Sequence, residues 1–113
     1  MPTTIFSVPS NTYAPQQITV NPTLPSGKTA IRVVLTTAGW PTGKCVDASM
    51  KYPDGSVAGG SSIDGGTPNR QGVFESSFGF KGIDGAALPS GQYAVVINVV
   101  QTVTTTVRVE STP

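Results

Sequence analysis

The sequence predicts an all-β chain folded as a single antiparallel β-sandwich, immunoglobulin-like or jelly-roll-like in plan. The first observation is a tetrapeptide that occurs twice: residues 24–27 and residues 88–91 both read Leu-Pro-Ser-Gly. Proline fixes φ and glycine reaches backbone conformations closed to other residues, so each copy predicts a turn. The second observation is the alternation of apolar and polar residues after each turn, which indicates a strand with one buried face. Four matching residues are too few to indicate a gene duplication.

About seven strands are expected along the chain. The predicted strands cover residues 17–21, 29–37, 45–52, 73–80, 93–100 and 103–110, and a short return strand begins at 57–58. Residues 53–56, Pro-Asp-Gly-Ser, favour a hairpin turn after the third strand. Residues 59–72 are rich in glycine and are predicted to be the least regular stretch, and a connection of that length is either functional or loose. No segment combines a helical period with capping residues.

Residues 1–15 are expected to form an extended arm, and residues 16–113 the β-sandwich domain. Pro2, Pro9 and Pro15 exclude a regular helix and interrupt any strand. The arm nevertheless carries several apolar side chains, so it should pack on its own sandwich or on a neighbouring chain. These side chains are Ile5, Phe6, Val8 and Tyr13.

The length and charge of the chain limit the classes of function that it can have. A chain of 113 residues is long enough for one sandwich domain. Its seven basic and six acidic side chains are scattered and give a net charge of +1, which argues against nucleic-acid binding and is compatible with self-association. The N-terminus lacks a secretory signal, and the longest apolar run, residues 93–100, is too short to span a bilayer. We therefore expect a complete, cytoplasmically made chain that does not bind a membrane.

The residue types exclude most catalytic chemistry. The absence of histidine removes Ser-His-Asp and Cys-His catalysis and most zinc sites. Cys45, the single cysteine, cannot form an intrachain disulfide, and at the start of a strand it is expected to be a small hydrophobe rather than a thiolate activated by Lys44. Asp54, Asp64 and Asp84 each precede glycine, as turn residues do, and Asp64 lacks the spacing of a calcium loop. We expect no enzyme activity, no cofactor and no metal site.

Three further residues are candidates for contacts with a partner. Trp40 lies between Gly39 and Pro41, where it either stacks on a sugar, enters a protein interface or caps the sandwich core. Arg70 and Gln71 fall in the glycine-rich stretch and are either contact residues or solvated. The predicted protein-interaction residues are thus Ile5, Phe6, Val8, Tyr13, Trp40, Arg70 and Gln71.

The plan of the chain resembles the small β-sandwich accessory proteins of tailed bacteriophages, such as head decoration proteins. The features that carry the resemblance are the proline-punctuated arm, the Gly-Trp-Pro-x-Gly loop at 39–43, the Asp54-Gly55 hairpin and the corner at 88–91 before two Val/Thr-rich strands. The segment leading to Tyr93 also loosely resembles the late strands of immunoglobulin-like domains, although their tryptophan and paired cysteines are absent. The resemblance implies many copies on a capsid or tail surface, with the arm reaching a neighbour. It assigns no residue roles.

Two functions are therefore carried forward. The first is a non-enzymatic structural protein of a phage virion, assembled in the host cytoplasm, that binds other virion proteins and forms a homo-oligomer. The second is a carbohydrate-binding or adhesion module in which Trp40 and Tyr13 or Tyr52 form a stacking platform; an immunoglobulin-like domain of a larger surface protein is a third possibility. Deleting residues 1–15 should abolish assembly in the first case, and Trp40→Ala should abolish glycan binding in the second.

Overall fold

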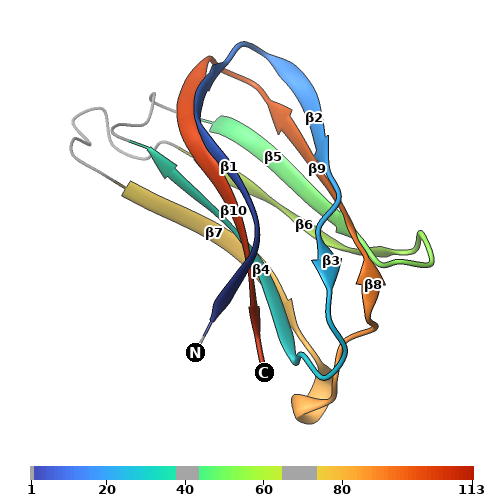
Figure 1. The fold of residues 1–113 in the computed structure, drawn as a ribbon. Helices are drawn as coiled ribbons and strands as arrows, with labels where there is room; N and C mark the ends of the chain where they lie inside the picture. The colour runs from blue at the N-terminus through green and yellow to red at the C-terminus, as the bar shows by residue number, and fades with distance from the viewer. Residues whose placement is uncertain (1, 38–43, 65–73) are drawn as a thin grey trace.

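The computed structural model describes residues 2–37, 44–64 and 74–113, and it confirms the all-β sandwich (Figure 1). A 3-10 turn, η1 (Ile83–Gly85), joins two of the strands. The strands are β1 (Thr3–Tyr13), β2 (Gln16–Val20), β3 (Thr23–Leu24), β4 (Ala30–Thr37), β5 (Lys44–Lys51), β6 (Val57–Asp64), β7 (Phe74–Lys81), β8 (Gly91–Gln92), β9 (Ala94–Val99) and β10 (Val103–Thr112).

The strand order decides between the two predicted plans. One four-stranded sheet has the order β1-β10-β4-β7, the other has β2-β9-β5-β6, and all pairs are antiparallel. The pairs are nested: β1 pairs with β10, β2 with β9, β3 with β8, β4 with β7 and β5 with β6. This is a long hairpin rolled up into a jelly roll. The immunoglobulin-like alternative does not describe the fold, since β1 lies beside β10 instead of beside the next strand along the chain.

The two Leu-Pro-Ser-Gly segments lie side by side. Strands β3 and β8 form a small third sheet in which Leu24 pairs with Gly91. Rolling up the hairpin produces this pairing, because the connection that follows β2 must run next to the connection that precedes β9. The Tyr93 backbone N–H donates to the carbonyl of Pro22, and the Leu88 N–H donates to that of Lys28, both at 2.8 Å. The repeated motif therefore forms a single double-stranded corner.

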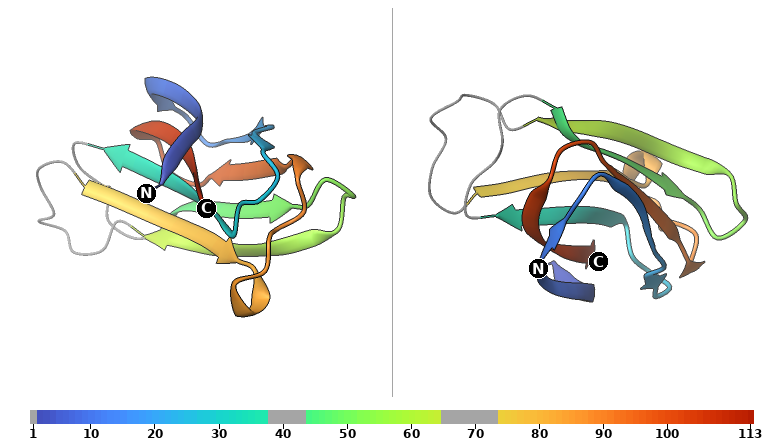
Figure 2. Two further views of the ribbon diagram at one scale, coloured as in Figure 1. Left: turned by 60° about the horizontal axis from the view of Figure 1, so that its bottom comes forward. Right: turned by 90° about the horizontal axis from the view of Figure 1, so that it is seen from above.

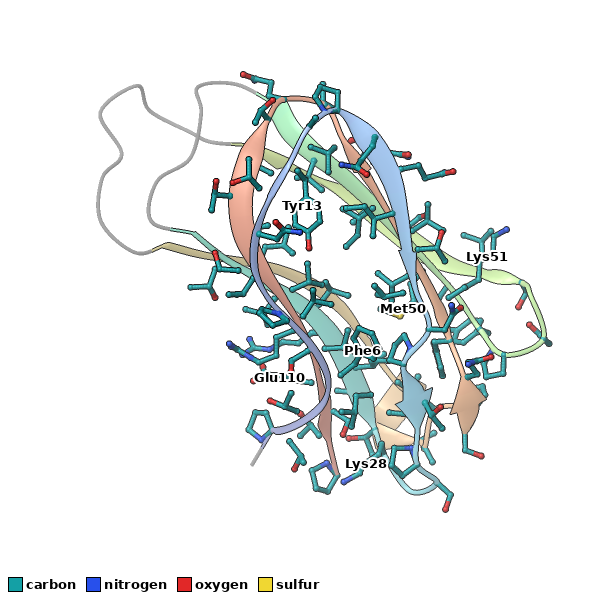
Figure 3. The ribbon with its side chains drawn as sticks, turned by 45° about the horizontal axis from the view of Figure 1, so that its top comes forward. Phe6, Tyr13, Lys28, Met50, Lys51 and Glu110 are labelled. Carbon is teal, nitrogen blue, oxygen red and sulfur yellow. The ribbon has the colours of Figure 1, made fainter. Side chains whose placement is uncertain are left out.

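The segment expected as an arm is the edge strand β1. It pairs with β10 from Thr3 opposite Ser111 to Tyr13 opposite Val103. Its apolar side chains are partly buried and pack against the sandwich's own core, as Figure 3 shows for Phe6 and Tyr13. These side chains are Ile5, Phe6, Val8 and Tyr13. Of the two alternatives left open by the sequence, the structure has the segment packing on its own domain.

Residues 59–64 belong to a strand, which corrects the expectation of an irregular stretch from 59 onward. Strand β6 pairs with β5 from Val57 opposite Lys51 to Asp64 opposite Lys44, with register shifts near both ends. Glycine suits this edge because the neighbouring backbone approaches closely. A Cβ on Gly60 would lie 2.9 Å from the carbonyl oxygen of Ala48. The glycines that suggested a loop instead allow a strand to pack tightly.

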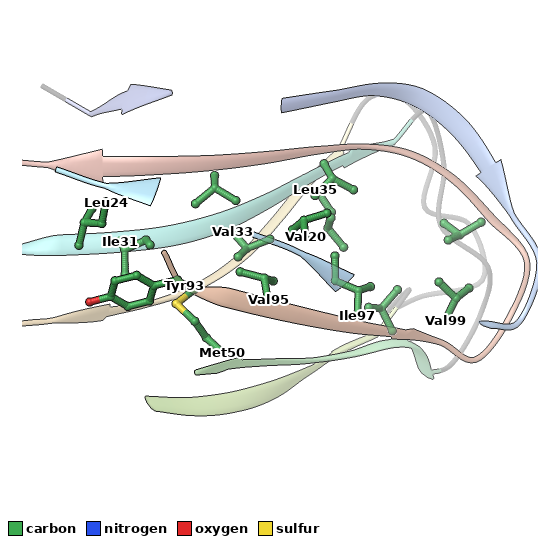
Figure 4. Packing of buried hydrophobic residues seen from close by; sticks show 14 of the residues in the cluster. Val20, Leu24, Ile31, Val33, Leu35, Met50, Tyr93, Val95, Ile97 and Val99 are labelled. Carbon is green, nitrogen blue, oxygen red and sulfur yellow. The ribbon is translucent and has the colours of Figure 1, made fainter. Parts of the chain in front are cut away.

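The core lies between the two sheets and contains the inward-facing residues that the alternation predicted (Figure 4). On β4, Ile31, Val33 and Leu35 are buried, and on β10, Val103, Thr105, Val107 and Val109 are buried. The other fully or nearly fully buried apolar side chains of the described residues are Val20, Pro22, Leu24, Val34, Val46, Ala48, Met50, Leu88, Tyr93, Val95, Ile97 and Val99.

Candidate interaction surface

Two long segments of the chain have no charged side chain, and the fold brings them together. No charged residue precedes Lys28, and none occurs from Gly85 to Val107. The first segment contains β1, β2 and β3, and the second contains β8, β9 and the first half of β10. These strands pair with one another, as β1 with β10, β2 with β9 and β3 with β8. We call the surface formed by residues 2–27 and 85–107 the uncharged wall.

The uncharged wall covers one side of the sandwich and includes a free edge of each sheet. Strand β1 is the edge of the first sheet, and β2 is the edge of the second (Figure 2). The exposed side chains of the wall are mostly Thr, Ser, Asn, Gln, Pro and Ala, and Val100 is its exposed large hydrophobic residue in the described part of the chain. Sheet edges usually carry charges, prolines or bulges that prevent pairing with another chain. Here the charges are missing from both edges.

A compact ion network marks the border of the wall on the outer face of the first sheet. The Arg32 Nε–H donates to Glu110 Oε1 at 2.7 Å, and the Arg108 Nε–H donates to Glu110 Oε2 at 3.2 Å. Burial raises the pKa of Glu110, but the hydrogen bond and charge of Arg32, together with those of Arg108, outweigh that effect and hold the pKa below its usual value. The network links β4 to β10 on the outer face of the sheet. Figure 3 shows Glu110 on this face and Phe6 on the core side.

Tyr93 stabilises the Leu-Pro-Ser-Gly corner within the wall. Its ring is fully buried, and its hydroxyl donates to the carbonyl oxygen of Pro89 at 2.7 Å. This bond to the backbone four residues upstream has the geometry of a tyrosine corner. Tyr52 packs edge-on against the ring, with centroids 5.8 Å apart. Burial, with a smaller contribution from Tyr52, raises the pKa of Tyr93 from 10.0 to about 12.

The outer face of the second sheet carries a row of hydrogen-bonding side chains. Gln17 on β2 is opposite Asn98 on β9, and Asn98 is opposite Asp47 on β5. Gln17 and Asn98 are exposed, and Asp47 is half-buried. Amide and carboxylate groups spaced across neighbouring strands can form hydrogen bonds to a polar, uncharged ligand.

The structure brings some of the predicted interaction residues together and leaves others undescribed. Ile5, Phe6, Val8 and Tyr13 all lie on β1, within the uncharged wall, with their side chains turned toward the core. Their contact with another chain stays a prediction. Trp40, Arg70 and Gln71 lie outside the described residues.

The described residues offer no metal centre and no membrane-spanning helix. Over residues 2–37, 44–64 and 74–113, no three acidic or thiol side chains gather into a cluster suited to a metal ion. Nor does this part of the chain contain a helix with the length and apolar character needed to cross a membrane.

Sequence reasoning missed the wall, although its signal was present. The net charge of the whole chain hides this feature, because the informative property is where charged residues are absent. Two charge-free segments some sixty residues apart mean little in the sequence, since only the nested pairing shows that they form one surface.

Comparisons with known proteins support the β-sandwich fold and do not identify a family. No protein-family model matches the sequence, and no curated protein matches it. One similar solved structure is a carbohydrate-binding module of Cellvibrio mixtus lichenase 5A in complex with cellotriose. It is 13% identical, with a TM-score of 0.53, and the match covers 98% of this chain and all of the module. Another is VP2 of infectious bursal disease virus in a subviral particle, 12% identical with a TM-score of 0.51. That match covers 96% of this chain and 32% of VP2, so this chain spans about a third of the viral protein.

Proposed function

We propose that the chain is a non-enzymatic structural protein of a virus particle, held on the capsid or tail by protein–protein contacts of its uncharged wall. The observation that carries the proposal is the wall itself: a continuous side of the domain with two sheet edges and no charged side chain. Charged residues are depleted from the buried centre of protein interfaces, because each must lose its hydration there.

The finer proposal is a decoration or tail protein of a bacteriophage, present in many copies. Outside the wall, Arg32 on β4 and Lys51 on β5 are exposed charged side chains that keep another side of the domain hydrated. A domain with one charged and one uncharged side can bind a surface and remain exposed to water on its other side. A viral protein from a subviral particle is among the similar structures, which supports this role.

The direct test is to measure whether the protein is part of purified particles. Quantitative mass spectrometry of density-purified particles from the cells that encode the chain should give a fixed number of copies per particle, and antibody-labelled particles should show it on their surface. A protein found in the cell extract and absent from the particles would disprove the proposal.

A matched pair of variants tests the role of the wall in that attachment. Thr12→Lys adds a positive charge to an exposed residue of β1, inside the wall, whereas Val57→Lys adds the same charge to β6, on the opposite side. Val57 is 67% exposed, and Thr12 is exposed but shares a surface hydrogen bond with the Thr104 hydroxyl, so equal unfolding temperatures of the two variants are the folding control. We expect Thr12→Lys to reduce incorporation into particles and Val57→Lys to leave it unchanged. Equal incorporation of the two variants would show that the wall is not the attachment surface.

A second candidate function is glycan binding, and one observation favours it. The row of Gln17, Asn98 and Asp47 offers hydrogen-bonding groups in register on an open sheet face. A similar structure that is matched over its whole length is a carbohydrate-binding module. A panel of soluble oligosaccharides, cellotriose included, tests this candidate by calorimetry. Binding that is lost in Asn98→Ala or Trp40→Ala and kept in Val57→Lys would favour it over the structural role.

A further inference from the structure

The four free sheet edges of the described sandwich are protected to different degrees. Strand β1 contains Pro9 and two shifts of register against β10, both of which hinder pairing with another chain. Strand β6 has two shifts of register against β5, and it lies beside β7, the edge of the other sheet. Strand β2 has none of these features. Its five residues pair with β9 without interruption and include no proline and no charge.

The side chains of β2 suit an antiparallel partner. Gln17 and Thr19 point outward and are exposed, whereas Ile18 and Val20 face the core. Ile18 is only half-buried, because it lies at the edge of the sheet. Every second residue of an edge strand directs its N–H and C=O groups away from the sheet, so β2 presents unpaired donors and acceptors beside an incompletely covered isoleucine.

The electrostatics favour a second copy as the partner. Around a two-fold axis an edge strand meets its own copy, so that charged residues near its centre would face like charges. Strand β2 avoids this repulsion, since neither it nor the adjacent β9 carries a charged side chain. Pro15 and Pro22 flank the strand and limit the pairing to the residues between them.

We propose that two copies of this chain pair antiparallel through β2, forming one continuous sheet across both molecules. The symmetric register that uses the whole strand places Ile18 opposite the same residue of the second copy, and Gln17 opposite Thr19. The inference rests on the proposed function for its setting, a particle surface on which copies lie close together. Five paired residues bury less than the roughly 1,200 Å² of a stable complex. The contact is therefore weak in dilute solution and gains strength when copies are concentrated on one surface.

A pair of double variants tests the contact and its register together. Gln17→Lys/Thr19→Lys places lysine opposite lysine at both cross-strand positions, whereas Gln17→Lys/Thr19→Glu places lysine opposite glutamate. Sedimentation velocity from micromolar to millimolar concentration should show a reversible wild-type dimer. We expect the first variant to raise the dissociation constant about tenfold or more and the second to keep dimerisation. Both changed side chains are exposed, so equal unfolding temperatures provide the folding control.

Disulfide trapping checks the register directly. In a Cys45→Ser background, a chain with Gln17→Cys mixed with a chain carrying Thr19→Cys should form a mixed disulfide under mild oxidation, faster than either chain with itself. The matched control uses Ser10→Cys and Thr12→Cys, two exposed residues with the same spacing on the bulged edge β1. A wild-type monomer at every concentration, equal dimerisation of the two double variants, or equal trapping on β1 and β2 would each overturn the proposal.

The two proposals fail in different ways. If the chain is found on particles but the β2 variants behave alike, the β2 contact is wrong and the structural role stands. If the charge pair shifts dimerisation as expected but the chain is absent from particles, the β2 contact stands and the structural role is wrong.

Discussion

The uncharged wall and the strands opposite it share one hydrophobic core but differ in the side chains that they expose to water. On the outer face of the first sheet, Arg32, Glu110 and Arg108 form an ion network, and β5 presents Asp47 and Lys51 on the second. The wall relies on neutral hydrogen bonds, as between the hydroxyls of Thr12 and Thr104, 2.8 Å apart. Its stability must therefore come from apolar burial and backbone pairing. Its surface can meet another chain without desolvating a charge.

The largest expected effect on stability comes from deleting β1, the strand at one edge of the wall. Deleting residues 1–15 removes β1 and four half-buried apolar side chains. We expect the free energy of unfolding to fall by roughly 4 kcal/mol or more, enough to unfold many domains of this size. Circular dichroism during thermal unfolding measures the loss. A truncated chain with unchanged stability would show that β1 is a dispensable arm, and only then would the deletion be a clean test of assembly.

The corner within the wall allows a comparison between its two identical tetrapeptides. Gly27 has a φ of +82° and open space around its Cα, whereas Gly91 has a φ of +126° and Pro53 carbons 3.2 Å from the position of a Cβ. Gly27→Ala should cost about 1 kcal/mol from backbone strain. Gly91→Ala should cost about 2 kcal/mol or more, because contact with Pro53 adds to the strain. Urea unfolding of the two variants gives both values, and equal costs would contradict the described packing.

The buried hydroxyl of Tyr93 provides the next smaller effect. Tyr93→Phe keeps the ring and leaves the carbonyl of Pro89 without this donor, so it should cost about 1 to 1.5 kcal/mol. Tyr52→Phe, which keeps the ring contact, is the control and should change stability little. The raised pKa of Tyr93 also has a consequence at high pH. Because its ionised form is disfavoured in the folded state, its contribution is complete below pH 10.0 and is lost as the pH rises toward about 12.

The smallest effect is expected in the charged network, since Arg32 is 46% exposed at its side chain and solvent screens the pair. Glu110→Gln should cost at most about 1 kcal/mol at neutral pH. The folded-state pKa of Glu110 lies below 4.5, so its contribution is present above that pH and is lost on acidification. Wild type and variant should converge in stability in acid. A constant difference across the acid range would assign the loss to packing instead of charge.

Local sequence was sufficient for the strands whose two faces differ. On β10, Val103, Val107 and Val109 fall on one face of the strand, and this pattern predicted one buried and one exposed face. The observed burial of β10 alternates in the same way. The predictions of burial and of strand positions were wrong where the environment of a residue is set by neighbouring strands and not by the local sequence. Val34 has the outward parity of Arg32 and Thr36 but is fully buried, with Cα partners Arg108 and Ser77 on the adjoining strands. The glycines of β6 suggested a loop, although an edge strand accepts them where the next backbone is close.

Local patterns in the chain predict the all-β class, the turns and most of the core, because proline, glycine and period-two alternation act through the local backbone. The jelly-roll order and the place of residues 3–13 within a sheet depend on the tertiary structure. The tertiary structure also determines that the two Leu-Pro-Ser-Gly segments pair and that the two charge-free segments form one wall. These features join residues far apart in the chain, and pairing between distant strands depends on how the whole hairpin rolls up.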